Sequence, residues 1–131
     1  MKLKLGSKEL VARAEREITT LTPGEVNERI GNDGVLLIDV RDYRELKKEG
    51  KIAGSINVPR GLLEFWIDPD SPYYKDFFDQ AEEIIFHCAL GLRSALAAQT
   101  VKNMGFENVS HMGGGFSQWV DDIGKVESVG K

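Results

Sequence analysis

A single cysteine, Cys88, lies in the part of the sequence best suited to chemistry. It follows the apolar run Ile84–His87, and a short loop that contains Gly91 and Arg93 comes directly after it. This order predicts a strand, a tight turn and a helix. In an open α/β sheet ligands bind at the carboxyl ends of the strands, so Cys88 has a position typical of an active site.

The loop after Cys88 has features of an anion-binding turn. If it curls around the sulfur, its backbone N–H groups point inward and the following helix adds the positive end of its dipole. Such surroundings favour the thiolate, which is the nucleophilic form. Gly91 lets the chain turn without a Cβ clash, and Arg93 offers a planar cation for oxyanions.

The alternative interpretation of Cys88 is a small buried core residue, the common role of a lone intracellular cysteine. A core strand has no need of a loop with glycine and arginine directly after it, so we expect catalysis at Cys88. The expected substrate-binding residues are those of the loop, Ala89, Leu90, Gly91, Leu92 and Arg93.

Length and composition restrict the class of protein. The 131 residues, 41% of them hydrophobic, fit one domain (1–131) with one core. A net charge of −4 argues against general binding of nucleic acid or of anionic membranes. One cysteine forms no intramolecular disulfide, and we find neither a signal peptide nor an apolar stretch of about 18 residues. We expect a cytoplasmic protein without nucleic-acid or membrane partners.

Strands alternate with helices along the sequence, which predicts an open α/β sheet. The predicted strands are short apolar runs, Val35–Val40, Ile56–Val58, Ile84–His87 and Val109–His111. The predicted helices start at capping signals, at Ser7 (helix about 7–18), Thr22, Asp42, Ser71 and Ser94. We expect the aromatic-rich segment 60–80 to cover one face of the sheet, and the tail after Trp119 to be loosely packed.

Four segments resemble motifs of the rhodanese family, in family order from about residue 22 to residue 119. Leu37–Arg41 is similar to the Asp-Val-Arg motif, and Gly50–Pro59 resembles the Gly-His-Ile-x-Gly-Ala-x-Asn-x-Pro signature, with Lys51 in place of the histidine. His87–Ser94 is similar to the active-site loop, and Gly113–Trp119 resembles the terminal Gly-Gly…Trp motif. The resemblance implies a mostly parallel sheet of about five strands with helices on both faces.

The resemblance also implies sulfur transfer. The Cys88 thiolate attacks the outer sulfur of a donor such as thiosulfate, sulfite leaves, and the persulfide passes its sulfur to a thiol, cyanide or a sulfur-carrier protein. Backbone amides of residues 89–93 stabilise the persulfide, Arg93 holds the sulfonate end of the donor, and no metal or organic cofactor takes part. The family places Asp39 and Arg41 near the site, where we expect structural support.

Two other functions stay open. Phosphatases that share this fold place arginine six positions after the cysteine, whereas Arg93 lies five after Cys88, which favours sulfur over phosphoryl transfer. A phosphatase or arsenate reductase, and a non-catalytic binding or sensor module, remain the alternatives. His87 points away from Cys88 if it continues the strand, and with His111 it makes a poor metal site. Leu90 makes the rim of the loop apolar.

Overall fold

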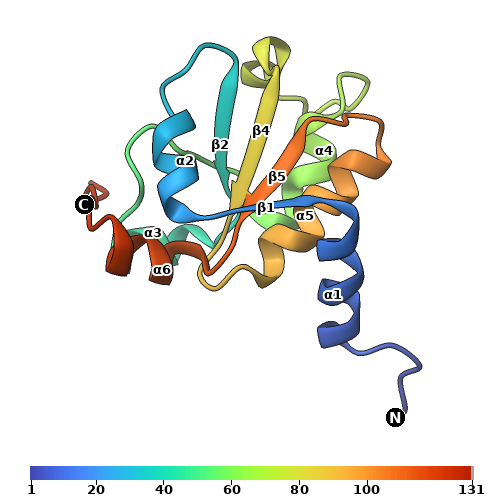
Figure 1. The fold of residues 1–131 in the computed structure, drawn as a ribbon. Coiled ribbons are helices and arrows are strands. Elements are labelled where there is room, and N and C mark those ends of the chain that lie inside the picture. The colour runs from blue at the N-terminus through green and yellow to red at the C-terminus, as the bar shows by residue number, and fades with distance from the viewer. Residues whose placement is uncertain (131) are drawn as a thin grey trace.

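The computed structural model describes residues 1–130 and shows a five-stranded parallel sheet (Figure 1). The strands are β1 Thr19–Leu21, β2 Val35–Asp39, β3 Ile56–Asn57, β4 Glu83–His87 and β5 Val109–Met112. The helices are α1 Ser7–Glu17, α2 Pro23–Arg29, α3 Tyr43–Glu49, α4 Leu63–Ile67, α5 Leu92–Asn103 and α6 Gly115–Asp122, with 3₁₀ turns at Arg60–Leu62 and Asp76–Gln80. The strand order is β1-β5-β4-β2-β3, and every neighbouring pair is parallel.

Helices cover both faces of the sheet, as expected (Figure 1). Alternate residues of the central strands point to opposite faces because the side-chain period of a strand is two. Ile84 and Phe86 pack with α5 and with the aromatic segment 60–80, whereas Ile85 packs with α2 and α6. The predicted cover of one face by the aromatic segment is therefore confirmed. Helix α1 lies outside α5, where Ala14 contacts Ala95.

Local capping chemistry sets the ends of α2 and α3. The side chains of Thr22 and Asp42 each accept a hydrogen bond from a backbone N–H in the first turn of the helix. The carboxylates of Glu25 and Glu45 each accept one from the N–H of the capping residue. Gly50 ends α3 with φ 89°, and a Cβ at this position would lie 2.5 Å from the side chain of Val126. The predicted helix boundaries in this part of the sequence are confirmed.

Three predicted helix starts differ from the structure, and the smallest difference is at α5, which begins at Leu92 and not at Ser94. The N-cap of α1 is Gly6, which has an extended backbone, and no side chain caps this helix. Ser7, the predicted N-cap, is the first residue of the helix itself. No helix begins at Ser71, because this serine and Asp68 accept hydrogen bonds from backbone N–H groups two residues further on. Such local turns compete with helix formation.

The segment after Trp119 is packed, contrary to expectation. Helix α6 continues to Asp122, and Trp119 is buried and donates its indole N–H to the carbonyl oxygen of Lys125 at 2.7 Å. Lys51 and Glu127 then exchange two backbone hydrogen bonds, of 2.9 and 2.8 Å. Three further elements, β1, α4 and α6, were not predicted. Every helix within residues 1–130 is too short or too polar to cross a bilayer.

Candidate active site

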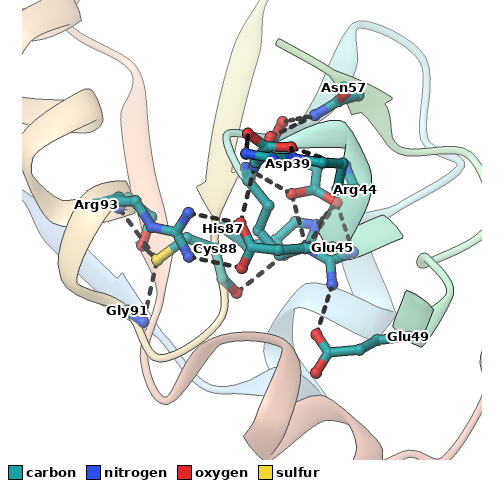
Figure 2. Close-up of polar contacts among 12 residues, drawn as sticks. Asp39, Arg44, Glu45, Glu49, Asn57, His87, Cys88, Gly91 and Arg93 are labelled. Carbon is teal, nitrogen blue, oxygen red and sulfur yellow. Dashed lines mark hydrogen bonds and ion pairs between the residues drawn. The ribbon is translucent and has the colours of Figure 1, made fainter. Parts of the chain in front are cut away.

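The sulfur of Cys88 lies at the carboxyl end of β4, in the middle of the sheet, and faces the first turn of α5. Backbone N–H groups of Gly91 and Ser94 donate to Sγ at 3.2 and 3.4 Å (Figure 2). The hydroxyl oxygen of Ser94 lies 3.5 Å from the same sulfur. The N–H donors and the positive end of a twelve-residue helix favour a negative charge on this atom.

The loop that carries these N–H groups is held by α6. The N–H groups of Phe116 and Ser117 donate to the carbonyl oxygens of Cys88 and Ala89 at 2.7 and 3.1 Å. Because these carbonyls point toward α6, the loop can turn N–H groups toward the sulfur. Gly115 makes this close approach possible, since a Cβ there would lie 2.6 Å from the carbonyl group of Ala89.

Arg93 forms an ion pair with Glu45 of α3. Its two terminal nitrogens contact the two carboxylate oxygens at 2.8 and 3.0 Å (Figure 2). The hydrogen bond from Arg93 lowers the pKa of Glu45, which also belongs to the capping box of α3. The cation that was expected to hold the donor is thus close to the loop but already paired with a carboxylate.

Asp39 and Arg41 are fully buried beneath this arrangement. The Arg41 guanidinium contacts the Asp39 carboxylate at 2.8 to 3.1 Å, donates to the carbonyl oxygen of Gly50, and lies 4.2 Å from the centre of the Phe116 ring. The amide of Asn57 donates to the backbone oxygens of both Asp39 and Arg41 at 2.9 Å. The pair therefore joins β2, β3, the end of α3 and the start of α6, which is the geometry of structural support.

His87 belongs to the buried ion-pair region and not to the thiol. Its Nε2 lies 3.6 Å from a carboxylate oxygen of Asp39, and its Nδ1 lies 3.5 Å from the backbone oxygen of Cys88. Burial lowers the pKa of His87, so the neutral ring is favoured. No group of three or more His, Cys, Asp or Glu side chains in residues 1–130 is placed to hold a metal ion.

His111 and Ser94 form a buried pair beside Cys88 that sequence reasoning missed. Nδ1 of His111 lies 2.9 Å from Oγ of Ser94. The available signal was topological, because His111 lies near the carboxyl end of β5, and β5 is the neighbour of β4. From the sequence alone, His111 suggests no more than a poor metal ligand.

The rim of the loop is apolar. Leu90 and Leu92 leave 62% and 55% of their surface exposed. A pocket of about 520 Å³ adjoins the loop, and its apolar wall includes Leu90 and Val120, while Glu49 and Asp121 add carboxylates. The surface next to the cysteine therefore offers apolar contact and negative charge.

Comparison with known proteins identifies the family. The model of the rhodanese-like domain family matches residues 22–122. A mouse thiosulfate sulfurtransferase/rhodanese-like domain-containing protein is 30% identical over 105 residues, which is 76% of this chain and 67% of the relative. A tRNA uridine(34) hydroxylase of Prochlorococcus marinus is 29% identical over 98% of this chain, but the chain spans only 44% of the hydroxylase.

Solved structures agree on the fold. A protein of Rhodopseudomonas palustris described as a "possible tyrosine phosphatase" is 43% identical with a TM-score of 0.91, and the match covers 97% of this chain and 98% of that one. A human single-domain sulfurtransferase is 21% identical with a TM-score of 0.66, covering 81% and 96% of the two chains. With a family model that covers well over half of its residues, the chain belongs to the rhodanese-like domain family.

Proposed function

We propose that the protein is a sulfurtransferase in which Cys88 carries a sulfane sulfur as a persulfide. The thiolate attacks the outer sulfur of thiosulfate or a related donor, the donor's S–S bond breaks, and sulfite leaves with the electron pair. A thiophilic acceptor then attacks the outer sulfur of the persulfide, and the Cys88 thiolate is the leaving group. The two steps transfer one sulfur atom and restore the enzyme.

The observation that carries this proposal is the pair of N–H donors on Sγ of Cys88, from Gly91 and Ser94. These donors are fixed before any substrate binds, because α6 holds the carbonyl oxygens of the loop. Preorganised N–H groups stabilise charge that develops in the reaction without a cost of reorientation. The same groups serve the thiolate that attacks the donor and the thiolate that leaves from the persulfide.

The surface around the loop supports an acceptor with an apolar part. Leu90 and Leu92 are exposed on the rim, and the pocket beside the loop carries two carboxylates. Because Glu45 pairs with Arg93, this cation attracts a small dianion less strongly than an unpaired guanidinium would. An organic thiol or a protein thiol fits these surroundings better than a small, highly charged acceptor.

A phosphatase is the second candidate, and the description of the R. palustris protein favours it. The loop spacing opposes it, because Arg93 follows Cys88 by five positions. In phosphatases of this fold the arginine lies six positions after the cysteine, so the loop that holds the phosphate is one residue longer than the loop from Cys88 to Arg93. If the purified protein hydrolyses an aryl phosphate at a rate that Cys88→Ser abolishes, this second function replaces the first.

Mass spectrometry of the intact protein tests sulfur transfer. Brief treatment with thiosulfate is expected to add one sulfur atom to the wild type, and cyanide is expected to remove it. Cys88→Ser is the matched control, since it keeps the size of the side chain and loses the thiol, and it should stay unchanged. If the wild type gains no sulfur from thiosulfate or from a second donor, mercaptopyruvate, the proposal is contradicted.

A further inference from the structure

A continuous series of polar contacts leads from Cys88 to the surface. Sγ of Cys88 lies 3.5 Å from Oγ of Ser94, and this oxygen lies 2.9 Å from Nδ1 of His111. Nε2 of His111 lies 3.1 Å from Oγ1 of Thr20 and 3.6 Å from a carboxylate oxygen of Glu15. Cys88, Ser94 and His111 are buried, whereas 46% of the Glu15 side chain is exposed.

The negative charge of Glu15 favours one direction for these hydrogen bonds. In that arrangement the neutral His111 ring carries its proton on Nε2, where Oγ1 of Thr20 accepts it at 3.1 Å and the Glu15 carboxylate lies 3.6 Å away. Nδ1 of His111 is then an acceptor, and the hydroxyl of Ser94 donates to it. The lone pairs of Ser94 Oγ remain available for the S–H group of Cys88.

We propose that Ser94 and His111 form a proton relay for the Cys88 thiol, with Glu15 as its counter-charge. The S–H bond breaks and its proton moves to Ser94 Oγ, while the proton of Ser94 moves to Nδ1 of His111. The products are a thiolate, a serine hydroxyl that now donates to it, and an imidazolium that faces the Glu15 carboxylate. No other reactant is needed, since one proton has moved along two hydrogen bonds.

Burial keeps the His111 ring neutral at rest, because desolvation lowers its pKa. The Glu15 carboxylate acts in the opposite direction and, together with the new thiolate, stabilises the imidazolium. On the other side of the thiol, Arg93 of α5 is already paired with Glu45 of α3. His87 of β4 faces Asp39. The imidazolium is therefore a positive charge that forms only when the thiolate forms.

This inference rests on Cys88 being the reactive thiol of the proposed sulfurtransferase, and it assigns a positioning role to His111. The relay keeps the thiol proton inside the protein while the thiolate attacks the donor. The relay also gives His111 of β5 a role. Ser94 donates its backbone N–H to the sulfur, and its hydroxyl connects the sulfur to His111.

The test is a pH titration of the thiolate by its ultraviolet absorbance, with the Cys88→Ser spectrum subtracted. His111→Phe removes the ring nitrogens, and His111→Asn keeps a hydrogen-bonding group for Ser94 but takes up no proton. Both variants are expected to move the titration midpoint upward by about one unit, which is about tenfold less thiolate at a pH well below both midpoints. If the thiolate of His111→Asn titrates with the wild-type midpoint, His111 acts only as a hydrogen-bonding partner of Ser94, and the relay is overturned.

Surface variants keep the test decisive if a buried substitution prevents folding. Glu15→Gln removes the counter-charge and should raise the midpoint, while Glu17→Gln on the same helix is exposed and should leave it unchanged. An unchanged midpoint in Glu15→Gln would contradict the role of the carboxylate. The titration needs no sulfur donor, so a normal relay with no thiosulfate adduct would refute the proposed function alone.

Discussion

Replacing Gly115 by alanine tests whether the turn after β5 holds the loop after Cys88 in place. Gly115 has φ 62°, a conformation that costs an L-residue about 1–2 kcal/mol. The new Cβ would lie 2.6 Å from the carbonyl carbon and oxygen of Ala89 and 2.7 Å from the carbonyl oxygen of Cys88. These are backbone atoms that no rotamer change can move, and overpacking of this kind costs about 1–3 kcal/mol more. We expect Gly115→Ala to lower the free energy of unfolding by about 2–5 kcal/mol.

Gly54→Ala is the matched control for this prediction. Gly54 has φ 84°, but a Cβ there would meet no atom within 4 Å, so its substitution carries the backbone cost alone, about 1–2 kcal/mol. Urea unfolding measures both variants, and mass spectrometry after thiosulfate treatment measures persulfide loading. Gly54→Ala should load normally and Gly115→Ala poorly. Equal losses of stability and equal loading would refute the assigned contact between this turn and the loop.

Three further predictions concern buried and paired charges. Asp39→Ala removes the buried carboxylate that pairs with the Arg41 guanidinium and leaves it the half-exposed carboxylate of Glu49 at 3.7 Å. Urea unfolding should show a loss of about 3–5 kcal/mol in the free energy of unfolding. Arg93 holds the pKa of Glu45 below its ordinary 4.5, so their ion pair stabilises the fold above about pH 4.5. This stabilisation is lost as the pH falls through the lowered pKa. Glu45→Gln should therefore make the free energy of unfolding less sensitive to acid. Burial lowers the pKa of His87 from its ordinary 6.5, so below about pH 6.5 the unfolded state binds a proton before the folded state does and the free energy of unfolding declines. His87→Gln should make the free energy of unfolding depend less on pH below about pH 6.5.

Features with a local cause could be predicted from the sequence. The capping box at Thr22 and the glycine end of α3 at Gly50 depend on residues a few positions apart, and both lie where expected. The apolar run that forms β4 identified a buried strand, and its end placed Cys88 at the edge of the sheet where ligands bind. Patterns within one element carried this part of the prediction.

Features that depend on distant partners were missed. β1 has three residues, too few to show an alternating pattern, and it is a strand because Thr20 pairs with His111 of β5. Nothing in the loop reveals that Arg93 meets Glu45, 48 positions earlier in the chain. The Ser94–His111 contact likewise joins two elements whose proximity follows from the strand order. Sequence reasoning selected Cys88 as the candidate nucleophile, and the fold shows which groups surround it.

The short hydrogen bond from the Phe116 N–H to the carbonyl oxygen of Cys88 makes one amide proton a natural reporter of the loop. The loop cannot move away from α6 without breaking this hydrogen bond and exposing the proton to solvent. Exchange of the Phe116 amide with deuterium would therefore measure the free energy of local opening at the cysteine. A bulky acceptor that requires such opening can react no faster than this amide is exposed.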